Sequence, residues 1–246
     1  MREILADLVA EQQGLDQSLQ RAPDRDWKTK VGDRGWTTQD TIAYLWWVER
    51  QIAVILTDKV APAKVIEQYG TLEAFEQAGV ENAKPKRPQE IIEQWRFARA
   101  DVVDALSRLR GNDRVPWING DVSAQTFATM RLADTWAHGL EILTSLDKEI
   151  TDTPRLRHIS WLGWATLPHA FAKTAQNYFE VVRVELVGPG YARWLFGPED
   201  GVQVIRGQAS EWCRVVVGFM DPTEAEMLTA TGDLAEAALH TANIRP

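Results

Sequence analysis

The first half of the chain carries hydrophobic residues at the spacing of amphipathic helices. Apolar positions recur every three or four residues within residues 2–20, which predicts a first helix there. The same periodicity predicts further long helices over residues 38–57, 88–110 and 124–146. We therefore expect the N-terminal part of the protein to be a bundle of four long helices.

Two of these helices have recognisable start signals. Thr37 is followed three residues later by Asp40, a pattern typical of a capping box at a helix N-terminus. Ser123 is placed to cap the fourth helix in the same way. Residues 61–88, which contain several prolines and lysines, separate the second helix from the third and hold a short helical piece near 72–79.

The hydrophobic pattern changes after about residue 150. A fifth helix is predicted over residues 154–176, and Pro168 should either kink it or divide it in two. Alternating apolar residues then predict strands, with two helices after them. The expected strands are 179–187, 191–196 and 202–205, and the expected helices lie near 209–218 and 233–242.

Helices first and strands afterwards predict an α+β protein built from separate modules. We expect a helical bundle over residues 1–150, a connecting helix over 151–177, and a small α/β domain over 178–246.

The composition fits a globular protein that works in the cytoplasm. The net charge of −8 argues against nucleic acid or an anionic membrane surface as a partner. No stretch approaches the roughly 18 apolar residues of a membrane span, and the chain opens without a signal-peptide pattern. Cys213 is the only cysteine, so no intrachain disulfide can form. It stands beside Trp212 in a predicted helix and is expected to be a small buried residue. We expect a monomer or a homodimer.

The fourth predicted helix carries the clearest candidate chemistry. Arg131, Asp134, His138 and Glu141 share one helical face with Phe127. An aspartate and a histidine four residues apart can hold one metal ion, or one can orient the other for proton transfer. The same spacing also occurs on ion-paired solvent faces, so spacing alone leaves this alternative open.

Several segments of the chain resemble mycothiol-dependent maleylpyruvate isomerase-like proteins of the DinB-like superfamily. The first is Gly35-Trp36-Thr37-Thr38-Gln39-Asp40-Thr41-Ile42-Ala43-Tyr44-Leu45. Others are Val115-Pro116-Trp117, Ser123-Ala124, Phe127-Ala128-Thr129, Trp136-Ala137-His138-Gly139, Arg155-Leu156-Arg157-His158 and the segment from Trp194 to Asp200. The resemblance covers nearly the whole chain.

This resemblance implies an up-down four-helix bundle followed by a small α/β C-terminal domain. It also implies a divalent metal, usually zinc, in the bundle, with the thiol cofactor mycothiol bound beside it. The implied chemistry is isomerisation or thiol transfer.

The chain departs from the metal-ligand pattern of the family. The family uses a histidine in the second helix and a Glu-x-x-x-His pair in the fourth, where this chain has Tyr44, Asp134 and His138. Tyrosine is a poor zinc ligand unless it is deprotonated, and its free pKa of about 10 opposes that. We therefore expect a degenerate metal site, and no cofactor, although Asp134 and His138 are the candidate ligands if metal is bound.

The chain contains 11 tryptophans, several of them close to these residues. As we align it, the family often carries arginines in the fifth helix where this chain has Ala165 and Leu167. This exchange suits a flat hydrophobic ligand better than a hydrophilic thiol. We expect the substrate to contact Trp47, Arg131, Trp161, Trp164 and His169.

Three functions are compatible with the sequence. The favoured one is an isomerase, cyclase or lyase acting on a hydrophobic small molecule, with Tyr44, Asp134 and His138 as the catalytic set. The second is a metal-dependent mycothiol S-transferase or isomerase, in which Glu141 could also hold the metal. The third is a binding protein that sequesters a small molecule without turnover.

Overall fold

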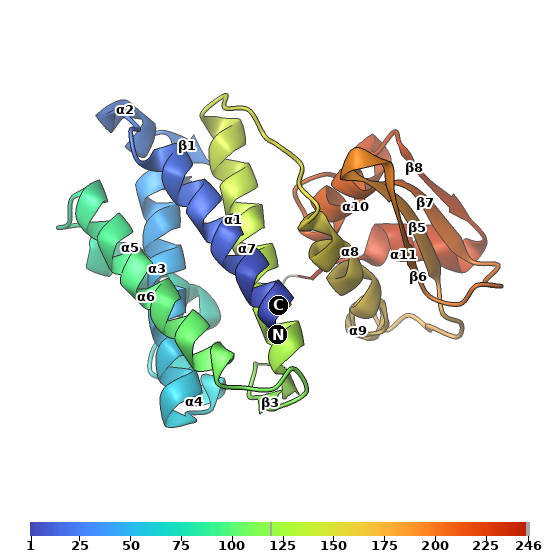
Figure 1. Cartoon of the computed structure of the whole chain (residues 1–246), viewed down its shortest axis with the longest axis horizontal. Coiled ribbons are helices and arrows are strands. Elements are labelled where there is room, and N and C mark those ends of the chain that lie inside the picture. Colours follow the sequence, from blue (N-terminus) through green and yellow to red (C-terminus); the bar gives the residue numbers. More distant parts are fainter. Residues whose placement is uncertain (119, 245–246) are drawn as a thin grey trace. The chain divides into compact units, whose positions relative to one another are not determined.

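A computed structural model describes residues 1–118 and 120–244 of the chain. The chain divides into two compact units, Met1–Ile150 and Thr151–Pro246, each with its own core. The first unit is helical and the second combines helices with a sheet (Figure 1). The α+β fold class predicted from the sequence is confirmed.

Four long helices make up the first unit: α1 (Arg2–Leu19), α3 (Thr38–Asp58), α6 (Pro88–Ser107) and α7 (Ala124–Ser145). Helix α3 packs along α6, and α1 packs along α7. The side chains between them are apolar and almost fully buried, as Leu8, Leu45, Trp95 and Phe127 illustrate. The predicted four-helix bundle is confirmed, with α6 ending three residues earlier than expected.

Both expected N-caps are present. The Thr37 hydroxyl accepts a hydrogen bond from the Asp40 backbone N–H, while the Asp40 carboxylate accepts one from the Thr37 backbone N–H. The Ser123 hydroxyl accepts from the backbone N–H of Thr126. Each cap also ends a two-stranded ladder that the sequence did not reveal. The ladders pair β1 (Lys30–Val31) with β2 (Trp36–Thr37) and β3 (Arg114–Val115) with β4 (Val122–Ser123).

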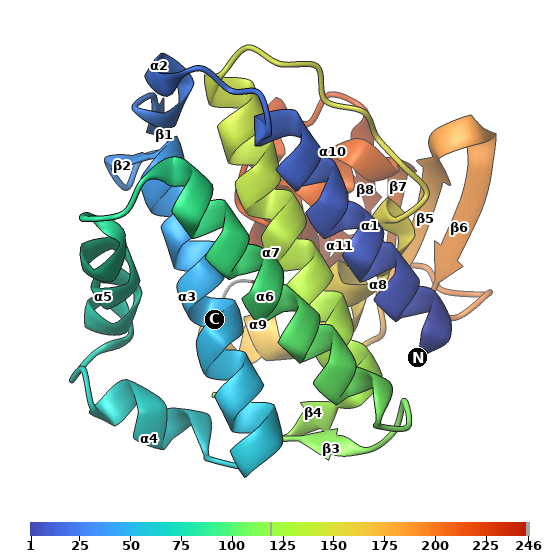
Figure 2. The ribbon, with the colours of Figure 1, turned by 60° about the vertical axis from the view of Figure 1, so that its left-hand side comes forward.

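Short helices fill the connections of the bundle. They are α2 (Asp24–Trp27), α4 (Pro62–Glu67) and α5 (Leu72–Ala83). Helix α5 is the expected helical piece near 72–79, four residues longer than predicted, and it lies beside α3 (Figure 2). Gly79 makes this packing possible, because a Cβ at that position would lie 2.6 Å from the Cβ of Trp47. The close contact fixes α5, and the side chains it carries, against α3.

The second unit begins with two helices, α8 (Leu156–Ala165) and α9 (Leu167–Lys173). Residues 151–177, expected as a connecting helix, belong to this unit, and their helical part is divided at Thr166, two residues before Pro168. Proline lacks an amide hydrogen and is tolerated only in the first turn of a helix, which is where Pro168 stands in α9.

A four-stranded sheet forms the rest of the second unit, in the order β6-β5-β7-β8. Strand β5 pairs antiparallel with β6 and parallel with β7, and β7 pairs antiparallel with β8. The elements are β5 (Arg183–Gly188), β6 (Ala192–Phe196), β7 (Val204–Gln208), α10 (Ala209–Val216), β8 (Leu228–Thr231) and α11 (Asp233–Thr241), with 3₁₀ turns η1 (Pro189–Tyr191) and η2 (Pro222–Glu224). Strand β8 was not predicted, and Phe179 to Val182 precede the first strand instead of belonging to it.

Cys213 lies on α10 in the core of the second unit. Its thiol is fully buried, and burial raises the pKa to about 12. The expectation of a small buried residue is confirmed. Among the described residues, no helix combines the length and apolar character that crossing a membrane requires.

Candidate active site

The polar face predicted on α7 points into the bundle. Arg131 and His138 are buried, and Asp134 is exposed over only a quarter of its side chain. Phe127, on the same face, is fully buried and packs edge-on against Trp117. The face is therefore not an ion-paired solvent face.

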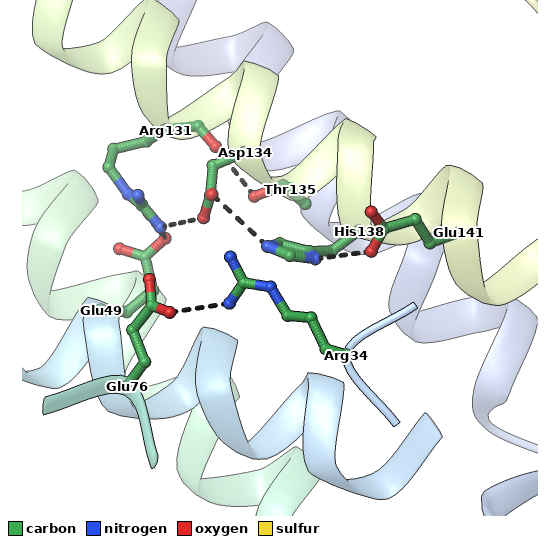
Figure 3. Close-up of polar contacts among 8 residues, drawn as sticks. All are labelled: Arg34, Glu49, Glu76, Arg131, Asp134, Thr135, His138 and Glu141. Carbon is green, nitrogen blue, oxygen red and sulfur yellow. Dashed lines mark hydrogen bonds and ion pairs between the residues drawn. The ribbon is translucent and has the colours of Figure 1, made fainter. Parts of the chain in front are cut away.

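Arg131 occupies the centre of this buried group. Its Nη2 donates to Oε1 of Glu49 and to Oδ2 of Asp134, each at 3.0 Å, and its Nε donates to the same Glu49 oxygen at 3.3 Å. Glu49 comes from α3 and is fully buried. An ion pair thus connects the second and fourth helices of the bundle directly beside Asp134 (Figure 3).

Burial and charge compete at this ion pair. Burial raises the pKa of the Glu49 carboxyl, although the adjacent Arg131 opposes that change. Burial alone would lower the pKa of Arg131, but the charges of Glu49 and Asp134 outweigh it and raise that pKa above its ordinary value. Arg131 therefore remains charged, and it supplies the positive charge that Asp134 faces.

His138 lies between two carboxylates. Its Nδ1 is 3.1 Å from Oε2 of Glu141, within hydrogen-bond distance, whereas its Nε2 is 3.6 Å from Oδ1 of Asp134, which is too long for one. When the imidazole is neutral, this geometry places its proton on Nδ1, which donates to Glu141, and leaves Nε2 as an acceptor. Glu141 therefore orients the imidazole, and Asp134 acts on it through its charge.

Tyr44 packs against the imidazole from α3. Its ring meets the His138 ring edge to face at 4.9 Å between centroids and lies 5.4 Å from the ring of Trp36. Burial raises the pKa of the Tyr44 hydroxyl well above its ordinary value, and the charges of Asp134 and Glu76 raise it further. Tyr44 is therefore a neutral phenol, able to donate a hydrogen bond.

The structure adds Arg34 and Glu76 to the residues predicted from the sequence. Arg34 projects from the turn between β1 and β2, and its Nη1 pairs with Oε2 of Glu76 on α5 at 2.7 Å. Figure 3 shows this pair beside His138. Burial raises the pKa of Glu76, in spite of Arg34, and Asp134 also raises it. No sequence pattern marked these residues, because only tertiary packing brings α5 to the site.

The predicted substrate contacts have varied surroundings. Trp47 lies on α3 among Trp46, Tyr69 and Phe75, and its indole is almost fully buried in that aromatic group. Arg131 is engaged by two carboxylates, as described above. Both side chains therefore have protein partners in this structure.

The other three predicted contacts belong to the second unit. Trp161 and Trp164 are partly buried on α8, and His169 is exposed on α9. The Trp164 indole N–H donates to the backbone oxygen of Val182 at 2.9 Å, and its ring stacks on Phe196. Trp164 therefore joins α8 to the sheet of its own unit.

The donor atoms around His138 do not fit a zinc site. Zinc needs at least three protein ligands drawn from histidine, cysteine and carboxylate groups. In the described part of the chain, no set of three such ligand atoms within metal-binding distance includes His138. Tyr44 is held as a neutral phenol, and Asp134 already accepts from the cationic Arg131.

Comparison with known proteins places this chain in a family. Residues 8–143 match the model of the mycothiol maleylpyruvate isomerase N-terminal domain, which is more than half of the chain. The chain belongs to this family. Two Mycobacterium tuberculosis proteins, Rv0036c of strain H37Rv and MT0041 of strain CDC 1551, are each 32% identical to it over 218 residues. That alignment covers 86% of this chain and 83% of each relative.

The fold of this mycothiol maleylpyruvate isomerase family member agrees with solved structures. A histidine-to-alanine variant of mycothiol-dependent maleylpyruvate isomerase superposes with a TM-score of 0.62 at 16% identity. The unmodified isomerase gives 0.61 at 15% identity. Each comparison covers 93% of this chain and 92% of the solved one, so the likeness includes the C-terminal unit.

Proposed function

We propose that the chain is an enzyme of the isomerase, cyclase or lyase type that acts on a hydrophobic small molecule without a bound metal. The observation that carries this proposal is the arrangement of His138, with Glu141 on one ring nitrogen and Tyr44 and Asp134 beside the ring. A positioned imidazole and a neutral phenol are sufficient for acid/base catalysis. Membership of an isomerase family supports the same reaction class.

The mechanism assigns one role to each side chain. Nε2 of His138 removes a proton from a carbon of the substrate, and Glu141 holds the resulting imidazolium through Nδ1–H. The charge of Asp134 stabilises that imidazolium from 3.6 Å. Tyr44 donates a hydrogen bond to the substrate oxygen that becomes negative. Return of the proton to another carbon completes an isomerisation with no co-reactant.

The surroundings of this set suit a flat, apolar group. The Tyr44 ring packs against His138, and the Trp36 ring packs against Tyr44 in turn. The Arg34 guanidinium lies over the Trp36 ring at 4.9 Å. Aromatic side chains next to convergent polar groups are typical of small-molecule sites. An aromatic or polyketide-like metabolite is the substrate class we favour.

A product-based screen tests this function. The purified full-length chain is incubated with apolar aromatic metabolites, with and without mycothiol, zinc and a chelator, and products of equal mass or of mass reduced by water are sought. We expect turnover that the chelator does not abolish. We also expect His138→Gln and Tyr44→Phe to lower it by about 10²- to 10⁴-fold.

Matched substitutions separate a chemical loss from a structural one. His240→Gln and Tyr191→Phe change the same residue types at exposed positions of the second unit and should leave turnover unchanged. Turnover that requires mycothiol or zinc would favour an S-transferase or isomerase of the kind that the family name describes. Binding without any product would indicate a sequestering protein and contradict the proposal.

A further inference from the structure

The buried Glu49–Arg131 pair is not explained by the stability of the bundle alone. Taking two charges out of water is costly, and well-packed apolar residues at such positions are often as stabilising as the ion pair. One oxygen of the pair, Oε2 of Glu49, has no hydrogen-bond partner among the described residues although it is fully buried. The arrangement therefore lowers the free energy of unfolding relative to an apolar one, and a role toward neighbouring side chains would account for it.

Arg131 of this pair places its positive charge beside one carboxylate of the proposed site, that of Asp134. Nη2 of Arg131 lies 3.0 Å from Oδ2 of Asp134, whose other oxygen faces His138. Glu49 prevents the guanidinium from moving away, because it holds both Nε and Nη2. Gln12 of α1 donates to the same Glu49 oxygen at 3.4 Å, so α1, α3 and α7 all take part in fixing Arg131.

We propose that Arg131, held by Glu49, is a built-in cation that occupies Oδ2 of Asp134 in place of a divalent metal and keeps such a metal from binding there. This inference rests on the metal-free catalytic set proposed above. A metal bound through His138 and Asp134 would share the carboxylate with the guanidinium, and like charges so close together repel strongly in a buried site. The absence of a zinc site then has two causes, the tyrosine at position 44 and the arginine at position 131.

The two causes can be separated by substitution in the full-length protein. Tyr44→His supplies a third zinc ligand, while Tyr44→His combined with Glu49→Leu and Arg131→Met also removes the cation without leaving an unpaired charge. Zinc affinity is measured by competition with a chromogenic chelator. We expect the triple variant to bind one zinc ion about 10- to 100-fold more tightly than Tyr44→His alone, because a charge that repels the ion is removed. Changes beside metal ligands usually alter affinity by an amount of this size.

Controls exclude folding and general electrostatic effects. Tyr44→His combined with Asp104→Leu and Arg108→Met removes an exposed ion pair of α6 and should bind zinc no better than Tyr44→His. Thermal melts followed by circular dichroism show whether each variant is folded. A second triple variant, with Glu49→Gln and Arg131→Gln, keeps polar side chains of similar length and should show the same gain if the apolar version does not fold.

Three results would overturn the proposal. The first is equal zinc affinity of Tyr44→His and a folded triple variant, and the second is a folded triple variant that binds no zinc. The third is stoichiometric zinc on the wild-type chain that is lost in His138→Gln. These are binding measurements, so a substrate screen that yields no product leaves their outcome unchanged, and the two proposals can fail separately.

Discussion

Two clusters of charge lie in the same helical bundle and are built differently. Between α1 and α6, the Asp16 carboxylate accepts from Arg96 at 2.7 and 2.8 Å and from Arg99 at 2.6 Å, so both of its oxygens are used. Between α3 and α7, Glu49 offers one oxygen to Arg131 and leaves the other without a partner. The Asp16 cluster is therefore complete, in that both carboxylate oxygens are hydrogen-bonded, whereas the Glu49 cluster is not.

The pKa changes of the two carboxylates follow this difference. Burial alone would raise the pKa of Asp16, but hydrogen bonds and charge from Arg96 and Arg99 outweigh it and lower that pKa. Burial dominates at Glu49 and raises its pKa. The comparison teaches that the partly solvated cluster of Asp16, Arg96 and Arg99 serves to hold α1 and α6 together. The fully buried pair of Glu49 and Arg131 also places a positive charge beside Asp134 in the candidate site.

Breaking the buried pair should have the largest effect. Arg131→Met leaves Glu49 buried without its counter-charge, which typically costs about 3–5 kcal/mol of unfolding free energy. Adding Glu49→Leu should recover most of that loss, since no isolated charge remains. Urea unfolding of the two variants and the wild type measures both values. A single variant as stable as the wild type would contradict the contrast drawn between the clusters.

Breaking the complete cluster should have a smaller effect that depends on pH. Asp16→Asn is expected to lower the unfolding free energy by about 1–3 kcal/mol at neutral pH. The folded-state pKa of Asp16 is lowered, so its contribution is present above the unfolded value of about 4 and is lost as the pH falls through the folded value. The difference between the two proteins should therefore begin to shrink as the pH falls below about 4 and continue to shrink at lower pH. A constant difference at all pH values would show that charge is not the cause.

Substitution of Arg34, the most exposed side chain of the candidate site, should affect stability least. Arg34→Gln removes an ion pair whose arginine is 44% exposed, so the loss should stay below about 1 kcal/mol. The same change should raise the pKa of Glu76 further, because Arg34 lowers it through both its charge and its hydrogen bond. Carboxyl ¹³C NMR over a pH series measures this shift. Arg108→Gln, which also removes an exposed arginine, should leave the Glu76 signal unchanged.

Much of the fold follows from local sequence signals. The long helices, the caps at Thr37 and Ser123, and the division near Pro168 were predicted from periodicity and turn chemistry. Strand β8 was missed because four residues, two of them threonine and one alanine, carry too little alternation to be told from a loop. Elements this short are specified by the partner strand on which they pair.

The candidate site could be predicted only along a single helix. The spacing of Arg131, Asp134 and His138 on α7 was visible, but which groups face them depends on packing between helices. Glu49 did give a signal, because it is an acidic residue directly after the mostly apolar run 42–48 of α3. Arg34 and Glu76 gave none, since they belong to a turn and a connecting helix whose positions depend on tertiary contacts such as that between Gly79 and Trp47.

The mutual dependence of Glu49 and Arg131 constrains how such a chain can change over generations. A lineage that loses either residue alone passes through a destabilised intermediate, whereas losing both restores stability. Descendants should therefore inherit the two positions as a unit, both charged or both apolar. Recovery of a tight metal centre would then require three substitutions, because the exchange at position 44 alone leaves the repelling arginine in place.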